Sequence, residues 1–214
     1  MSHALVTRYS SEPRRDGSEH ALVLLHGYGS HELDLLSLES MLPEDLLLVS
    51  LRAPVQEGPG FAWFPLAFQD SGELGFRRED VLSAAEGIER HLADELRPED
   101  FASVSVLGFS QGMALASVLA QRRRVPWAAV VGLSGFWVPA DEDADDDAPA
   151  GPAPLFWGRG LEDPVIPQRL VDETAAALDG RPHSVVKAYE GLPHAISPEE
   201  MRDVSAFLSA APAR

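Results

Sequence analysis

The sequence contains no cysteine and no asparagine. Without cysteine, disulfides, thiolate metal sites, iron–sulfur clusters and a cysteine nucleophile are excluded, and without asparagine there is no N-glycosylation sequon. Lys187 is the only lysine and follows no glycine-rich loop, so neither Schiff-base nor phosphate-loop lysine chemistry is expected. No apolar run reaches the roughly 18 residues that cross a bilayer, and Met1 to Arg15 lacks the apolar centre of a secretory signal. We therefore expect a cytoplasmic protein without stable membrane association.

Basic residues are also scarce, since 17 Lys and Arg face 34 Asp and Glu, for a formal net charge of −17. Such a chain repels nucleic acid and anionic membranes at long range, so no nucleic-acid partner is expected. The 214 residues, 45% hydrophobic and 24% charged, predict one globular domain over residues 1–214. Within it, the acidic low-complexity stretch 140–154 predicts a solvated, mobile loop. It lacks the spacing and central glycine of an EF-hand calcium loop.

Short β-branched runs alternate with helical periodicity, which is typical of an α/β fold with a mostly parallel sheet. The predicted strands are Ala21–Leu25, Leu46–Leu51, Val104–Gly108, Ala128–Leu133, Pro154–Trp157 and Ser184–Tyr189. Helices are predicted along the apolar stripe from Val81 to Leu96, after Ser110, after Pro167 and from Ser197. The last begins with Ser197-Pro198-Glu199-Glu200, which predicts a capping box. The segment from Val55 to Arg78, rich in Gly, Pro and aromatic residues, predicts a long loop that shapes a pocket.

The run Gly108-Phe109-Ser110-Gln111-Gly112 matches the G-x-S-x-G pattern. It stands between a strand and a helix, the setting of a nucleophile elbow. The two glycines leave room for a sharp turn in which neighbouring Cβ atoms would collide. We therefore take Ser110 as the candidate nucleophile. The near-match at Gly132 to Gly135 lacks the last glycine and predicts an ordinary turn.

A serine needs a base to take its proton, and the base needs a carboxylate to hold its tautomer. Where the chain order is serine, acid, histidine, each partner lies on a loop after a strand. Asp163 and His194 occupy such positions, and Glu162 is the nearest competitor for the acid. His26 precedes the serine, so we interpret it as a buried, hydrogen-bonded part of the loop scaffold. That loop, His26 to Ser30, follows a strand and predicts that the Tyr28 N–H completes an oxyanion hole with that of Gln111.

Five segments resemble the phospholipase/carboxylesterase family of α/β-hydrolases, which includes bacterial carboxylesterases and acyl-protein thioesterases. The segments are LVLLHGYGS, LRAPVQEGPGFAWF, VLGFSQGMALA, GLEDPVIP and GLPHAISPEEMRDVSAFL, and they extend from Leu22 to Leu208. The resemblance implies an α/β-hydrolase fold with little or no lid, Ser110 as nucleophile, Asp163 as acid and His194 as base. It implies Tyr28 and Gln111 in the oxyanion hole, acyl contacts by the aromatic segment with Phe61, Trp63 and Phe64, and a homodimer.

The sequence therefore predicts a carboxylesterase that cleaves small-molecule esters of short to medium acyl chains through an acyl-enzyme. No cofactor or metal ion is expected to take part. Two alternatives stay open. One is a thioesterase acting on acylated proteins or small thioesters, and the other is an inactive binding protein of the same fold.

Overall fold

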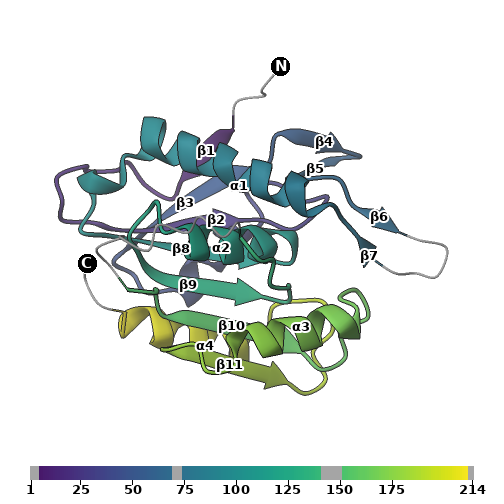
Figure 1. Ribbon diagram of the computed structural model, residues 1–214. Helices are drawn as coiled ribbons and strands as arrows, with labels where there is room; N and C mark the ends of the chain where they lie inside the picture. The colour runs from purple at the N-terminus through teal and green to yellow at the C-terminus, as the bar shows by residue number, and fades with distance from the viewer. Residues whose placement is uncertain (1–4, 69–73, 141–150, 212–214) are drawn as a thin grey trace.

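The structure is a computed structural model that describes residues 5–68, 74–140 and 151–211. Its centre is a seven-stranded sheet with the order β1-β3-β2-β8-β9-β10-β11 (Figure 1). The strands are β1 (Val6–Tyr9), β2 (His20–Leu25), β3 (Leu46–Arg52), β8 (Ser103–Phe109), β9 (Trp127–Leu133), β10 (Leu155–Gly160) and β11 (Ser184–Tyr189). All neighbours are parallel except β1, which runs antiparallel to β3 at one edge. The predicted mostly parallel sheet is confirmed, and all six predicted strands are present.

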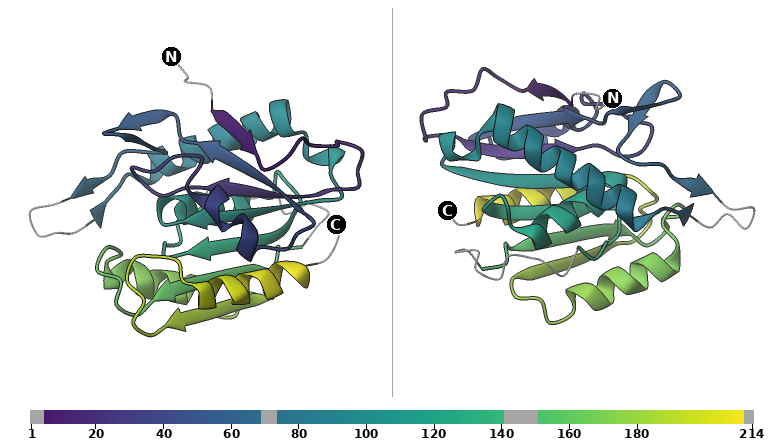
Figure 2. Two further views of the ribbon diagram at one scale, coloured as in Figure 1. Left: turned by 180° about the vertical axis from the view of Figure 1, so that it is seen from behind. Right: turned by 45° about the horizontal axis from the view of Figure 1, so that its top comes forward.

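Helices cover both faces of the sheet, as predicted. They are α1 (Arg78–His91), α2 (Gln111–Arg122), α3 (Gln168–Leu178) and α4 (Pro198–Ser209). Along β2, Val23 and Leu25 pack with buried residues of α1, α2 and α3, whereas Leu22 and Leu24 pack with those of α4 and the 3₁₀ helix η1 (Leu35–Met41). Alternation with a period of two thus divides the core into two layers. Figure 2 shows α4 on the face opposite α1 and α2.

The apolar stripe from Val81 to Leu96 forms one continuous buried face, but not one regular helix. After α1 ends at His91, a π-helical segment covers η2 (Leu92–Leu96), and a 3₁₀ turn follows at η3 (Pro98–Asp100). The other central helix, α2, is buried from Gln111 to Ala120 and packs on β2, β8, β9 and α1. Because α2 is enclosed on several sides, the residue before its first turn is held firmly.

The predicted long loop from Val55 to Arg78 instead forms two small antiparallel hairpins in its described part. One pairs β4 (Val55–Glu57) with β5 (Gly60–Ala62), and the other pairs β6 (Ala67–Phe68) with β7 (Leu74–Gly75). The first is tied to the loop after β2, where Phe61 N–H donates to the Ser30 carbonyl (2.8 Å) and Gly29 N–H donates to the Phe61 carbonyl (2.9 Å). Main-chain bonds of this kind leave no sequence pattern, which is why these strands, like β1, were not predicted.

The start of α4 corrects the predicted capping box in one respect. Ser197 is the N-cap, and its Oγ accepts a hydrogen bond from the Glu200 N–H (3.1 Å). The return bond from the Ser197 N–H to the Glu200 carboxylate is present only as a weak contact. Neither oxygen of this buried carboxyl has a partner within ordinary hydrogen-bond geometry, but the Ser197 N–H still lowers its pKa. The carboxyl group has turned into the core.

Most of the acidic stretch 140–154, for which a mobile loop is predicted, lies outside the described residues. At its start, Ala140 donates its N–H to the Gln121 side-chain oxygen (3.0 Å). After it, the chain rejoins the sheet at β10. The loop therefore stays a prediction.

Candidate active site

Ser110 occupies the turn between β8 and α2 in a strained backbone conformation. Its φ of 53° and ψ of −113° lie in a region that non-glycine residues rarely adopt. A Cβ at Gly108 would overlap the main chain of Gly112, and a Cβ at Gly112 would overlap the carbonyl of Leu25 on β2. The two glycines therefore allow strand, turn and helix to meet at contact distance, and the Ser110 hydroxyl faces a cavity at the carboxyl ends of the strands.

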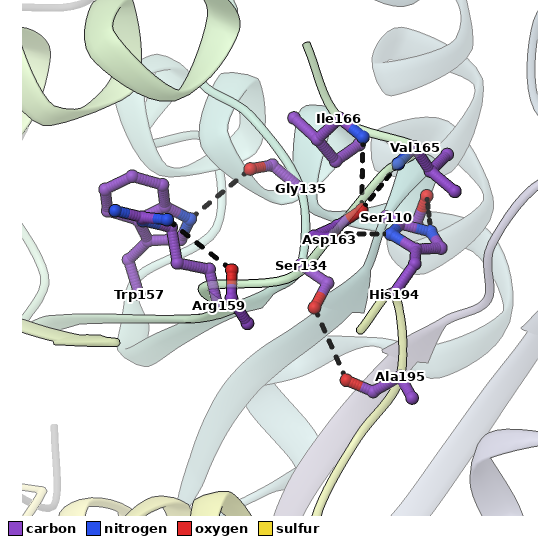
Figure 3. Close-up of polar contacts among 11 residues, drawn as sticks. Ser110, Ser134, Gly135, Trp157, Arg159, Asp163, Val165, Ile166, His194 and Ala195 are labelled. Carbon is purple, nitrogen blue, oxygen red and sulfur yellow. Dashed lines mark hydrogen bonds and ion pairs between the residues drawn. The ribbon is translucent and has the colours of Figure 1, made fainter. Parts of the chain in front are cut away.

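His194 lies after β11 and bridges the two other candidate residues. Its Nε2 is 3.0 Å from the Ser110 Oγ, and its Nδ1 is 2.8 Å from the Asp163 Oδ2 (Figure 3). A carboxylate can only accept a hydrogen bond, so Nδ1 carries the proton and Nε2 is left to accept the serine proton. The structure thus brings together Ser110, Asp163 and His194 in one hydrogen-bonded chain.

Asp163 lies after β10 and is held from several sides. Its Oδ1 accepts hydrogen bonds from the N–H groups of Val165 (2.8 Å) and Ile166 (3.2 Å). Burial alone would raise the pKa of the Asp163 carboxyl, but the hydrogen bond from His194 and these two amides outweigh burial, and the pKa lies below its ordinary value. Glu162, the competitor for this position, is exposed, and it is Asp163 that makes the hydrogen bond to His194.

His26 is fully buried and belongs to the scaffold. Its Nδ1 donates to the Gly27 carbonyl (2.7 Å), and its Nε2 accepts from the Ala53 N–H (3.1 Å). Burial lowers the pKa of the His26 imidazole. Both ring nitrogens are therefore occupied, and the side chain connects the loop after β2 to β3.

The two predicted oxyanion-hole residues, Tyr28 and Gln111, both line the Ser110 cavity. The Gln111 side chain is occupied elsewhere, since its Oε1 accepts from the Trp63 N–H (2.9 Å) and its Nε2 donates to the Phe64 carbonyl (2.7 Å). Its main-chain N–H is the first of α2 and so has no acceptor within the helix. The Tyr28 phenol interacts with Glu57, and burial first, then this contact, raises its pKa. What both residues can offer to a substrate is the backbone N–H.

The cavity has a volume of about 340 Å³. Its apolar lining residues are Leu66, Leu74, Phe109, Phe136, Val165 and Ile166, and the other members, besides Ser110 and His194, are Gly27, Tyr28, Ser30, Asp34 and Gln111. Leu66 directly precedes β6, and Leu74 is the first residue of β7. No sequence signal distinguished these two leucines from the many others in the chain.

The predicted acyl-contacting residues Phe61, Trp63 and Phe64 are not brought to this cavity. Trp63 and Phe64 are buried in the core and line a separate depression beside α1. The indole of Trp63 donates to the His26 carbonyl (2.9 Å), so the ring supports the loop from behind. The Phe61 ring instead lies against the Arg52 guanidinium, 4.7 Å from its carbon. These three residues are therefore absent from the described lining of the cavity, and acyl contact by the aromatic segment stays a prediction.

Over residues 5–68, 74–140 and 151–211, no three His, Asp or Glu side chains gather so that they could hold a metal ion. No helix in that part of the chain is both long and apolar enough to cross a bilayer.

Comparison with known proteins identifies a matching family, related sequences and a similar structure. Residues 10–211 match the Phospholipase/Carboxylesterase family. Acyl-protein thioesterase 1 of Saccharomyces cerevisiae is 28% identical over 157 residues, which cover 69% of this chain and 67% of the yeast protein. Carboxylesterase SOBER1 of Arabidopsis thaliana is 33% identical over 165 residues, which cover 69% of this chain and 66% of the Arabidopsis protein. The crystal structure of esterase PE8 superposes with a TM-score of 0.73 at 26% identity, over 98% of this chain and all of that one (100%).

Proposed function

Since this chain belongs to the phospholipase/carboxylesterase family of α/β-hydrolases and is a hydrolase of ester bonds, we propose that it cleaves small carboxylic esters with Ser110 as nucleophile, His194 as general base and Asp163 as the acid that orients His194. The observation that carries this proposal is the continuous hydrogen-bonded chain from the Ser110 Oγ through His194 to Asp163, with distances of 3.0 and 2.8 Å. Unconnected serine, histidine and aspartate residues would give no reason to expect an activated hydroxyl.

The mechanism follows from which atom can take a proton. Nε2 of His194 takes the Ser110 hydroxyl proton as Oγ attacks the ester carbonyl, and the carbonyl oxygen becomes an oxyanion. The N–H groups of Tyr28 and Gln111 donate to that oxyanion. His194 then returns the proton to the departing alcohol, which leaves an acyl group on Ser110. In the second half, His194 takes a proton from water, the hydroxide attacks the acyl carbonyl, and Ser110 regains its proton as the acid leaves.

The cavity favours short to medium acyl chains. Its volume of about 340 Å³ must hold both the acyl chain and the leaving alcohol of the ester. Each methylene buried against Leu74, Phe136 or Ile166 contributes about 0.8 kcal/mol until the cavity is full. We therefore expect kcat/KM to rise with acyl length and then to fall. A series of p-nitrophenyl esters from acetate to laurate tests this, and a maximum at laurate would contradict it.

A thioesterase acting on acylated proteins or small thioesters is the second candidate, because the yeast relative carries the name acyl-protein thioesterase. The same three residues serve both reactions. Rates on an oxygen ester and a sulfur ester with identical acyl and leaving groups separate the two. An inactive binding protein is the third candidate, and labelling of Ser110 by a fluorophosphonate would exclude it.

The cytoplasmic location and the homodimer also remain proposals. Light scattering of the purified chain tests the dimer directly, and a mass near 23.2 kDa would contradict it. Localisation of the tagged protein in its own cells tests the cytoplasmic location.

A further inference from the structure

We propose that the Asp34 carboxylate makes the Ser110 cavity selective for esters that carry a positively charged ammonium group. This inference rests on the proposed function and adds the substrate class. The side chain of Asp34 lines the same cavity as Ser110 and His194. It belongs to the segment after β2 that also carries Tyr28, whose N–H we assign to the oxyanion hole.

The carboxylate is held in place at the cavity wall. Its Oδ2 accepts a hydrogen bond from the Ser30 hydroxyl (2.6 Å), and Ser30 itself lines the cavity. The main chain of Ser30 is fixed in turn, because its carbonyl accepts from the Phe61 N–H (2.8 Å). Asp34 precedes the 3₁₀ helix η1, yet its side chain makes no capping bond there. Helix capping therefore does not explain this carboxylate.

The charge of Asp34 is also uncompensated. Among the described residues that line the cavity, none is Lys or Arg, and Asp34 is the only Asp or Glu. Its neighbour Glu32 is paired with Arg8 (3.9 Å) and Arg52 (3.6 Å). No ion pair within the described residues includes Asp34. A cationic ligand would thus supply a positive partner that the described cavity residues do not give this carboxylate.

The surroundings strengthen this preference. Leu66, Leu74 and Ile166 also line the cavity, so a hydrocarbon part of the substrate can be buried there while an ammonium group pairs with the exposed Asp34 carboxylate. The formal net charge of −17 adds a long-range field that attracts cations and repels anions. An ester with a hydrocarbon part on one side of the carbonyl and an ammonium group on the other therefore complements both walls.

The test uses two pairs of isosteric esters in which a quaternary carbon replaces the quaternary nitrogen. In the first pair the charge is on the alcohol, in butyrylcholine and 3,3-dimethylbutyl butyrate. In the second it is on the acyl chain, in ethyl 4-(trimethylammonio)butyrate and ethyl 5,5-dimethylhexanoate. We expect kcat/KM to favour the cation in at least one pair, by about tenfold at low salt, with the ratio decreasing as salt rises.

Two variants separate the local charge from the overall field. Asp34→Asn keeps the size of the side chain and should lower the cation-to-neutral ratio to about one. Glu162→Gln removes the same amount of charge from an exposed residue outside the cavity lining, and should keep the wild-type ratio. Should Asp34→Asn fail to fold, Ser30→Ala releases the carboxylate from its hydrogen bond and is expected to lower the ratio as well.

A cation-to-neutral ratio of one in the wild type, or the same raised ratio in wild type and Asp34→Asn, would overturn this inference. The proposed function would still hold in either case, provided that the neutral esters are hydrolysed. If none of the four esters is cleaved and a fluorophosphonate leaves Ser110 unlabelled, the proposed function fails, and the selectivity with it.

Discussion

The carboxyl group of Glu200 on α4 occupies the space that a side chain at Gly158 on β10 would fill. This contact joins the helix that follows His194 to the strand that precedes Asp163. Glu200 is fully buried and its oxygens lack hydrogen-bond partners. Burial raises the pKa of this carboxyl to about 7, and Asp203 adds to the effect while the Ser197 N–H partly offsets it.

The first prediction is that Glu200 makes stability fall as pH rises from about 4.5 to about 7. In this window the unfolded chain releases the Glu200 proton while the folded chain retains it, so deprotonation favours unfolding. Above pH 7 the Glu200 carboxyl is ionised in both the folded and the unfolded chain, so the loss of stability no longer changes with pH. The difference between the ordinary pKa of 4.5 and the folded value of about 7 corresponds to about 3 kcal/mol.

Chemical denaturation at pH 5 and pH 8 measures this. The Glu200→Gln variant should lose less stability than the wild type between the two pH values. Glu199→Gln, on the same helical turn but exposed, is the control and should follow the wild type. Equal pH dependence in wild type and Glu200→Gln would contradict the prediction. A difference in the free energy of unfolding between wild type and Glu200→Gln that is the same at both pH values would not bear on the prediction, because it reflects only the cost of burying the amide.

The second prediction concerns the nucleophile. A fluorophosphonate should label one serine, Ser110, and not Ser134, which lies buried in the turn after β9. Ser110→Ala should abolish labelling and reduce kcat below about one thousandth of the wild-type value. Peptide mass spectrometry locates the adduct. An adduct on any other serine would show that the nucleophile is misassigned.

The third prediction compares two adjacent carboxylates. Asp163→Asn should keep the fold but lose about 10³ to 10⁴ in kcat, because the amide stabilises the wrong tautomer of His194 and no longer balances its positive charge. Glu162→Gln should change kcat little, because that side chain is exposed. Steady-state kinetics of both variants on one p-nitrophenyl ester decide between them. The reverse order of effects would make Glu162 the acid.

The fourth prediction uses two glycines on helices. Gly112→Ala should destabilise the fold by about 1–3 kcal/mol and reduce activity, because its methyl group would overlap the Leu25 carbonyl and displace the Ser110 turn. Gly87→Ala on α1 meets open space and should stabilise by about 0.5–1 kcal/mol through helix propensity. Thermal unfolding measures both. A stable, fully active Gly112→Ala would mean that the turn does not depend on this close contact.

Much of the site could be predicted because its signals are local. The run from Gly108 to Gly112 carries the turn in its own five residues, and Asp163 and His194 each follow a strand that is readable from its β-branched residues. Parallel strands end at a common edge, so chain order was enough to propose that these distant residues meet. The structure places Ser110 and His194, 84 residues apart, within 3.0 Å of each other.

The side chains that form the cavity wall depended on tertiary structure. Trp63 and Phe64 resemble pocket residues in sequence, yet they pack inward, because main-chain bonds between Phe61 and the loop after β2 set the orientation of the first hairpin. Any residue can make such bonds, so the sequence does not encode them visibly. Glu200 is a similar case: its spacing from Ser197 predicts a cap, but only the room beside Gly158, on a distant strand, explains why its carboxyl group is buried. The amino-acid sequence by itself determined six strands of the central sheet, the turn and the order of the reactive groups, which depend on neighbours along the chain. Only the packing of segments far apart in sequence decided which side chains face the substrate.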